Sequence, residues 1–218
     1  MRKSLISLAM FAILALGLSA ICIVYATDHP ANSMWIEPEV IDVAGLSVGS
    51  RFNITVWLNV SVDCGAWQFY LIYNKQQLTV TKYGLTGTGG ARSQFFENTG
   101  TQTWGMVSSE DDHNATHKYI QIGESWKSGP WGTGCGSLAW IEFQIIAEPP
   151  FLCVLDIASG HHPPTSDTLA LDPNMQEIPL NVNNTPIIPE FTQWVLILSL
   201  FSVSIPCVVL KKYRVKIF

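Results

Sequence analysis

The sequence predicts an all-β protein: an antiparallel two-sheet sandwich with jelly-roll topology, together with an N-terminal signal segment and a C-terminal transmembrane helix. Three observations support this prediction. Residues 52–60 and 67–73 alternate between apolar and polar side chains, which is the period of strands that bury one face. Further short strand-like runs are separated by Gly-rich turns. Finally, both ends of the chain carry long stretches without charge.

Residues 1–26 are expected to form a signal peptide or a signal anchor. Arg2 and Lys3 precede an uncharged run, and residues 24–26 (VYA) offer a small-residue cleavage site. The run is longer than the apolar core of about 7 to 15 residues in most signal peptides, and it approaches the length that spans a bilayer. Cleavage and retention as an anchor therefore both remain open. Residues 27–33 are expected to be a short linker.

Residues 191–210 are expected to form a transmembrane helix, because an uncharged run of about twenty residues spans a bilayer. The basic tail, residues 211–218, would stay in the cytoplasm. Residues 185–190 would be a linker, which leaves the middle of the chain outside, at the cell surface. The sequence Ile188-Pro189-Glu190-Phe191 resembles the PEF-type C-terminal sorting signal of archaeal surface proteins. A plain stop-transfer anchor is the alternative.

The charge of the segment between the two apolar ends argues against two kinds of partner. Residues 27–190 hold six basic and 17 acidic side chains, so this segment is strongly acidic. Nucleic acid needs a basic footprint, and an anionic membrane surface attracts basic segments. A chain of about 150 residues is long enough to bury one core. We therefore expect a single domain over residues 34–184 that binds no nucleic acid.

The expected strands follow one another through this domain. In the first, five apolar residues share one side; they are Phe52, Ile54, Val56, Leu58 and Val60. In the second, the apolar side carries Trp67, Phe69, Leu71 and Tyr73. Shorter strands are expected at residues 102–107 and 119–123, and a longer one at 136–145. The Gly-rich stretch 84–90 is expected to be a loop.

This strand pattern resembles that of cohesin modules, β-sandwiches that capture dockerin domains at cell surfaces. The matching segments are Val48-Gly49, residues 52–60, residues 66–73, Leu78 and residues 136–145, and residues 167–183 are similar to the family's final strands. The resemblance spans roughly residues 34–184. It implies a module that binds a protein partner of dockerin type and performs no catalysis. The sequence contains no catalytic motif, and we expect neither an enzyme nor a cofactor.

The resemblance implies that the partner binds the outward face of the strand 66–74. The outward residues would be Gln68, Tyr70, Ile72 and Asn74, a mixed surface suited to protein contact. The alternative is that a loop of the same domain covers this face. Cohesins usually carry Asp-Pro after the Tyr of this strand, whereas this chain has Asn74-Lys75.

Two other functions remain open. A carbohydrate-binding module would stack polysaccharide on exposed aromatic rings, and the candidate residues are Trp57, Trp126, Trp131 and Trp140. A structural envelope glycoprotein would only be displayed and glycosylated. Four N-x-S/T sequons are present for such glycosylation, at Asn53, Asn59, Asn114 and Asn183.

Three cysteines lie between the apolar ends of the chain. Cys135 and Cys153 flank one full strand, so they are expected at opposite ends of the sandwich. If the strand after Cys64 runs antiparallel to the strand after Cys135, then Cys64 lies near Cys153. We expect a disulfide between these two, with three unpaired buried thiols as the alternative. The acidic run 110–112 is expected to be a solvated loop rather than a metal site.

Overall fold

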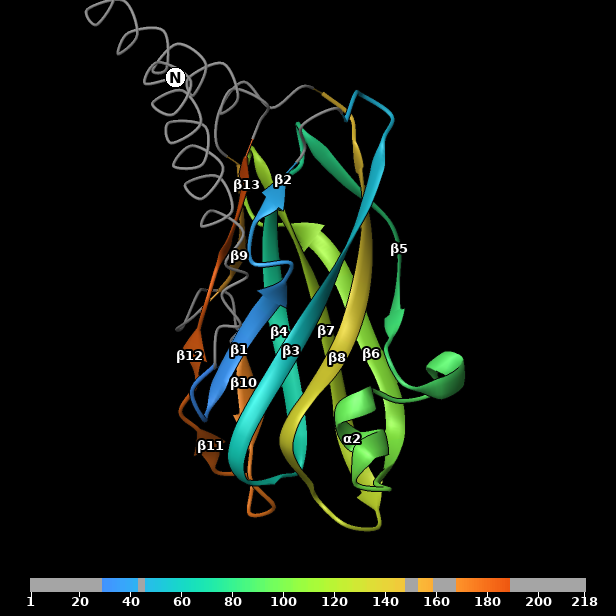
Figure 1. Cartoon of the computed structure of the whole chain (residues 1–218), viewed down its shortest axis with the longest axis vertical. Coiled ribbons are helices and arrows are strands. Elements are labelled where there is room, and N and C mark those ends of the chain that lie inside the picture. Colours follow the sequence, from blue (N-terminus) through green and yellow to red (C-terminus); the bar gives the residue numbers. More distant parts are fainter. Residues whose placement is uncertain (1–28, 43–45, 148–152, 159–167, 189–218) are drawn as a thin grey trace, which may run out of the picture.

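The computed structural model describes residues 29–42, 46–147, 153–158 and 168–188. They form two β-sheets packed face to face, with very little helix (Figure 1). The predicted all-β sandwich is thus confirmed. Within the described ranges, none of the helices is long and apolar enough to cross a bilayer. The expected signal segment, transmembrane helix and basic tail lie outside these ranges, as do residues 189–191 of the PEF-like motif.

The first sheet holds five strands in the order β12-β1-β3-β8-β5. Their bounds are Asn181–Val182 (β12), Ser33–Glu37 (β1), Arg51–Cys64 (β3), Gly132–Ile145 (β8) and Leu78–Leu85 (β5). The long strands β3 and β8 pair antiparallel over most of their length, from Arg51 opposite Gln144 to Cys64 opposite Gly132. This pairing joins two of the segments that the sequence predicts as strands.

The second sheet is built around β4 (Ala66–Asn74). One edge of β4 pairs with β7 (His117–Ser128), which in turn pairs with β6 (Gln102–Asp112). The other edge pairs with two short strands in succession, β10 (Leu169–Leu171) and β9 (Cys153–Ile157). Beyond them lie β11 (Glu177–Ile178) beside β10 and β13 (Thr185–Ile188) beside β9, and β2 (Ile41–Asp42) follows beside β13.

Several details depart from the predictions. β1 pairs in parallel with β12, and β2 pairs in parallel with β13, whereas the predicted sandwich is antiparallel. β13 extends the sandwich to Ile188, into the expected linker 185–190, since its backbone pairs with both β9 and β2. The acidic run 110–112 is the end of β6 and not a loop, because its backbone pairs with residues 118–120 of β7.

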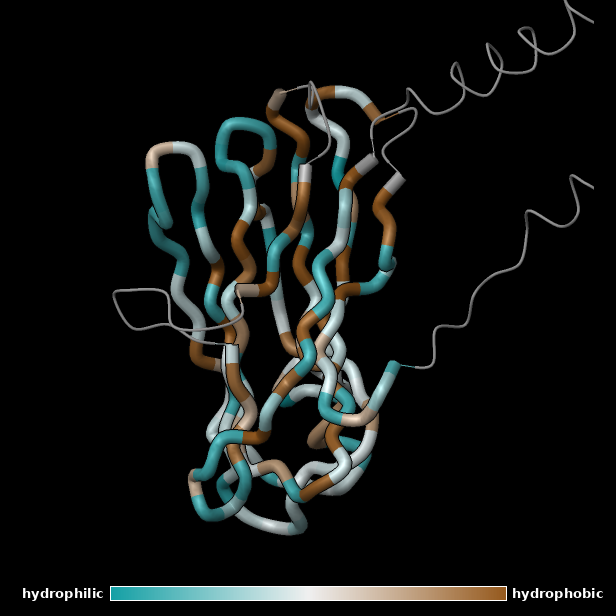
Figure 2. The backbone as a smooth tube through the Cα atoms, turned by 90° about the vertical axis from the view of Figure 1, so that its left-hand side faces the viewer, coloured by the Kyte–Doolittle hydropathy of each residue, from teal (hydrophilic) through white to brown (hydrophobic). Residues whose placement is uncertain are grey.

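The core lies between the sheets because the chain passes from one sheet to the other after nearly every strand. The inward side chains of β3 and β4 are buried; they are Ile54, Val56, Leu58 and Val60 from β3, and Trp67, Phe69, Leu71 and Tyr73 from β4. Figure 2 shows apolar and polar positions alternating along the strands. Burial of each large apolar side chain contributes about 1.5–3 kcal/mol. The two alternating segments therefore supply much of the stability of the sandwich.

One short helix, α2 (Gln94–Asn98), packs on β8 at the lower end of the sandwich in Figure 1, and the sequence analysis did not predict it. The Oγ of its N-cap Ser93 accepts a hydrogen bond from the Phe96 N–H, and Phe95 and Phe96 are buried. A Cβ at Gly136 would lie only 2.6 Å from the Phe95 Cα. The helix can approach β8 because the strand has no side chain there. A single 3₁₀ turn, η2 (Thr88–Gly90), occupies the Gly-rich stretch before it.

Candidate functional site

The outer face of the second sheet points away from the core and carries the predicted binding strand, β4. The strand register places Leu169, Gln68, Gly123 and Val107 in one row across β10, β4, β7 and β6. Residues directly opposite one another share a face of a sheet, and Gln68 alternates with the buried Trp67. This row therefore belongs to the outer face.

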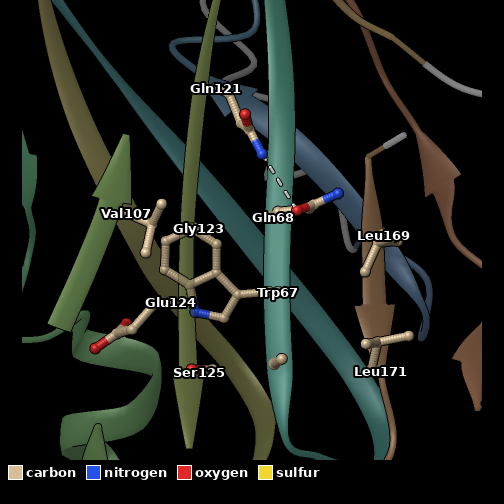
Figure 3. Close-up of a pocket in the computed structure, with 10 residues that line it drawn as sticks. Trp67, Gln68, Val107, Gln121, Gly123, Glu124, Ser125, Leu169 and Leu171 are labelled. Carbon is tan, nitrogen blue, oxygen red and sulfur yellow. Dashed lines mark hydrogen bonds between the residues drawn. The ribbon is translucent and has the colours of Figure 1, made fainter. Parts of the chain in front are cut away.

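A groove of about 220 Å³ opens on this row (Figure 3). Its middle is formed by small residues and its sides by apolar ones; the small residues are Ala66, Gly123 and Ser125, and the apolar ones are Val107, Leu169 and Leu171. A Cβ added at Gly123 would lie 3.0 Å from the Gln68 Cβ and 3.1 Å from the Trp67 carbonyl oxygen. Glycine at this position therefore keeps the sheet surface low and lets the two strands pair closely.

Two amide side chains lie at one side of the groove. The Gln121 Nε2 donates a hydrogen bond of 3.4 Å to the Gln68 Oε1, as the dashed line in Figure 3 marks. Such a long bond between two amides is easily exchanged for bonds to a ligand, because each amide carries both donors and an acceptor. The groove thus combines apolar walls with one polar pair, which is the composition typical of a protein-contact site.

Glu124 borders the groove, but its carboxylate lies on the other side of the sheet. Figure 3 shows the side chain directed away from the groove, towards α2. Both carboxylate oxygens accept hydrogen bonds from the Ser93 N–H, at 3.1 and 3.3 Å. Burial raises the pKa of this carboxyl, and hydrogen bonds from Ser93 and Thr103 oppose part of the rise. Glu124 therefore attaches the start of α2 to β7.

The structure separates the four residues that the sequence analysis assigned to partner binding. Gln68 lies at the groove. Tyr70 and Ile72 are only 6% and 9% exposed, in a cluster with Ala158 and Tyr119. The Tyr70 and Tyr119 rings have centroids 5.3 Å apart. Tyr70 and Ile72 are therefore covered by other residues of the same domain, in line with the alternative that this face is covered and does not bind a partner.

Asn74 also has a structural role. Its Oδ1 accepts a hydrogen bond from the Gln76 N–H, which forms the turn after β4. Only the first third of β4, from Ala66 to Gln68, therefore borders the groove. Sequence periodicity could not reveal this division, because Gln68 and Tyr70 share one face of the strand.

The four tryptophans proposed for glycan binding do not form one platform. Trp57 and Trp140 belong to strands of the first sheet, whereas Trp126 lies on β7 and Trp131 follows it in the β7–β8 turn. The Trp126 and Trp131 rings stack on each other with centroids 4.1 Å apart. Trp57 stacks on the buried Trp35 at 6.1 Å.

Trp140 and Trp131 each pack on a glycine. A Cβ at Gly84 would lie 3.1 Å from the Trp140 Nε1, and a Cβ at Gly65 would lie 3.3 Å from the Trp131 ring. The tryptophan with the greatest exposure among the described residues is Trp104 on β6, at 72%, and the Lys127 Nζ lies 4.8 Å from its ring centroid. Trp104 is not among the four tryptophans that the sequence suggested for glycan binding.

The four sequons differ in their surroundings. Asn53, Asn114 and Asn183 are exposed. Asn59 is half-buried, and its Nδ2 donates hydrogen bonds to the carbonyl oxygens of His29 and Pro30, at 3.2 and 3.3 Å. The amide nitrogen that would carry a glycan is therefore already engaged at Asn59 in the folded chain.

The predicted Cys64–Cys153 disulfide is wrong. Cys64 is a free, buried thiol whose Sγ donates a hydrogen bond to the Ala66 carbonyl oxygen. The prediction assumed that β4 and β8 run antiparallel, but both run from the same end of the sandwich, since Cys64 pairs opposite Gly132 at the start of β8. β9 pairs with the far part of β4, where Asp156 lies opposite Ile72. Cys153 therefore lies at the opposite end of the sandwich from Cys64. It also lies at the opposite end from Cys135, and this second separation was predicted.

Two of the three carboxylates at the end of β6, those of Glu110 and Asp112, are paired with lysines, and Glu110 also accepts from a hydroxyl group. The Lys75 Nζ lies 2.9 Å from the Asp112 Oδ1, and the Lys118 Nζ lies 3.3 Å from the Glu110 Oε1. The Tyr73 hydroxyl donates a hydrogen bond of 2.6 Å to the same Glu110 oxygen. Within the described ranges, no three His, Cys, Asp or Glu side chains gather so that they could hold a metal ion.

Comparison of the whole chain with protein-family models and with curated proteins finds no match. Solved structures do match. A type II cohesin domain from the cellulosome of Acetivibrio cellulolyticus is 16% identical with a TM-score of 0.51, over 72% of this chain and 95% of that one. The sixth cohesin of scaffoldin B from the same organism, solved with a dockerin, is 11% identical with a TM-score of 0.50, over 74% and 100%. The fold is cohesin-like.

A third cohesin match comes from an archaeon. The non-cellulosomal cohesin of Archaeoglobus fulgidus is 14% identical, with a TM-score of 0.48, over 73% of this chain and 91% of that one. At such low identities the cohesin likeness establishes the arrangement of strands and no more. The cohesin-like fold confirms the resemblance that the strand patterns 52–60, 66–73 and 136–145 indicated.

Proposed function

We propose that this chain is a non-catalytic, cohesin-like binding module that captures a protein partner of dockerin type at the cell surface. The observation that carries the proposal is the groove on the outer face of β10, β4, β7 and β6. It lies on the strand that the cohesin resemblance assigned to partner binding. Its apolar walls and its Gln68–Gln121 pair suit an apolar anchor side chain flanked by polar contacts.

Filling the groove tests this proposal. The full chain in mild detergent is immobilised, and binding of a panel of dockerin domains is measured by surface plasmon resonance. We expect Ser125→Leu, which puts a larger side chain in the middle of the groove, to weaken binding at least about tenfold, because well-packed central contacts dominate interfaces. Thr133→Leu, at an exposed position outside the groove, is the matched control and should bind as the wild type does.

The outcome against the proposal is equally definite. Equal dockerin binding by wild type and Ser125→Leu would show that dockerins bind the chain outside the groove. If the chain binds no dockerin although its circular dichroism shows an intact β-fold, the partner is not of dockerin type.

The position at the cell surface is part of the same proposal. Residues 1–26 would direct export, and residues 191–210 would hold the sandwich at the membrane with the tail 211–218 in the cytoplasm. If residues 1–26 are cleaved, deletion of residues 191–218 should release the sandwich from the membrane fraction into the medium of expressing cells; if they stay as an anchor, the truncated chain should remain in the membrane fraction. Retention of the truncated chain in the cytoplasm would contradict export.

Carbohydrate binding is the second candidate function, and one observation favours it. Trp104 is 72% exposed, and a flat exposed indole is a surface on which a sugar ring can stack. Retention on insoluble polysaccharide should then be lost in Trp104→Ala and preserved in Trp131→Ala, whose ring is already stacked on Trp126. If neither dockerins nor polysaccharides are retained, a structural envelope glycoprotein with exposed sequons Asn53, Asn114 and Asn183 is the remaining function.

A further inference from the structure

Strand β6 forms an open edge of the second sheet (Figure 1). Among the described residues its backbone pairs with β7 alone, so its other edge carries the N–H and C=O groups of a strand without a neighbour. Eight of its 11 residues are exposed. Three of these are large and apolar: Trp104 at 72%, Val107 at 70% and Met106 at 38% exposure.

The middle of this edge lacks the features that usually prevent edge-to-edge pairing. Such features are proline, lysine, bulges and inward charges. β6 contains neither proline nor lysine. A register irregularity lies at one end, between Thr103 and Met106, and three carboxylates lie at the other, in residues 110–112. Residues 106–109, between these ends, are protected by none of them.

The outer face of this edge carries opposite charges at its two ends. Asp111 shares the face of Val107, and Lys127 on β7 shares the face of Ser125, because side chains alternate along a strand. Glu110 and Asp112 are paired with lysines. Neither Asp111 nor Lys127 makes an ion pair with any other residue that the structure describes.

We propose that β6 pairs antiparallel with β6 of a second copy of this chain, about a two-fold axis at Val107. In this arrangement Asp111 of one copy lies beside residues 102 and 103 of the other, which pair with Ser128 and Trp126 on either side of Lys127. The two charged residues are then two strand spacings apart, ~10 Å, which an aspartate and an extended lysine can bridge. Two-fold symmetry forms the contact twice.

The orientation follows from the charges. Parallel pairing in register would place residues 110–112 of both copies side by side, and like charges directly opposite destabilise a sheet. The antiparallel arrangement instead places each acidic end beside the Trp104 and Lys127 end of the other copy. Exposed apolar surface at Val107 is buried at the axis, where the two copies contribute the same residue.

Sedimentation equilibrium of the full chain in density-matched detergent tests the proposal. We expect a concentration-dependent dimer. Val107→Lys should weaken it at least about tenfold, because charge at the centre of an edge opposes pairing. Val154→Lys on β9 is the matched control, since Val154 is also exposed, at 41%, but lies on a strand paired on both sides.

A charge exchange makes the test specific. Lys127→Asp alone should weaken the dimer, and the double variant Lys127→Asp with Asp111→Lys should restore it, because the pair is re-formed with reversed sign. Loss in the single variant with recovery in the double variant supports the proposal. A wild-type chain that stays monomeric overturns it, and so does a dimer that Val107→Lys and Lys127→Asp both leave intact.

Discussion

Gly123 lies directly opposite Gln68 in the pairing of β7 with β4, and a Cβ at Gly123 would stand only 3.0 Å from the Gln68 Cβ. The same Cβ would stand 3.1 Å from the Trp67 carbonyl oxygen, a backbone atom that cannot move without disturbing the strand. The glycine thus keeps the groove open and also sets how closely two central strands approach.

We therefore expect Gly123→Ala to lower both stability and partner binding. The free energy of unfolding should fall by about 1–3 kcal/mol, the usual cost of forcing an extra methyl group into a packed site. Guanidinium unfolding of the full chain in mild detergent, followed by tryptophan fluorescence, measures this. Ser125→Ala, on the same face, should change the free energy of unfolding by less than about 0.5 kcal/mol. Equal stability of the two variants would mean that the strands are not held this closely.

The cysteines should differ sharply in reactivity. Burial raises the pKa of Cys64 to about 12, so its thiol stays protonated and inaccessible near neutral pH. Cys135 is exposed, although partial burial and the charge of Glu37 raise its pKa as well. Iodoacetamide at mildly alkaline pH should label Cys135 and leave Cys64 unlabelled in the native chain, as peptide mass spectrometry would show.

Two further results bear on the cysteines. Glu37→Gln should speed the labelling of Cys135, because it removes a negative charge that disfavours the thiolate. A peptide linked through Cys64 and Cys153 in an unreduced digest would contradict the strand register that places β9 at the far end of β4.

Glu124 should make the sandwich more stable in mild acid relative to a variant without this carboxyl. Burial raises the pKa of Glu124 above its ordinary value of 4.5, so the native chain holds this proton more tightly than the unfolded chain. The contribution of the group is fully present below the ordinary pKa and is lost as the pH rises through the raised native pKa. Between neutral pH and the ordinary pKa, the stability of wild type should therefore rise relative to Glu124→Gln as the pH falls.

Glu142 provides a control with the opposite sign. Hydrogen bonding from Thr81 lowers the pKa of Glu142, and the charges of Arg51 and Lys82 add to the effect. Its stabilising contribution is present above its ordinary pKa and is lost as the pH falls through the lowered native pKa. Wild type should lose stability relative to Glu142→Gln in that acidic range. Urea unfolding across pH measures both differences, and parallel curves for wild type and Glu124→Gln would show that Glu124 is not buried.

The Tyr73 hydroxyl should stabilise the end of the second sheet. This hydroxyl donates a hydrogen bond of 2.6 Å to the Glu110 carboxylate, and the rest of the Tyr73 side chain is buried. Burial, together with Glu110, raises the pKa of Tyr73. Tyr73→Phe should lower the free energy of unfolding by about 1.5–3 kcal/mol, the range for hydrogen bonds to charged groups. Tyr83→Phe is the control, because the Tyr83 hydroxyl bonds to Ser108 at the exposed edge. If both variants lose the same free energy of unfolding, the effect comes from removal of the oxygen atom and not from the hydrogen bond to Glu110.

Much of the fold was predictable because strand periodicity is a local property. The alternation at 52–60 and 67–73 depends only on which residues face a core. Both segments form strands whose predicted apolar residues are buried, except for Phe52, which is half-buried against the core. The parallel pairs of β1 with β12 and of β2 with β13 were not predictable, because each joins segments more than 140 residues apart. Helix α2 escaped prediction because its five residues are stabilised by contact with β8 and not by their own periodicity.

The candidate site shows the same division. The sequence by itself determined that the outward residues of β4 share one face and that Gln68 belongs to it. Only the tertiary structure decided that Tyr70 and Ile72 are covered, that the groove opens beside Gln68, and that Cys64 lies far from Cys153. The physical reason is that alternation specifies the side of a strand to which a residue points. What lies on that side depends on strands and loops that arrive from distant parts of the chain.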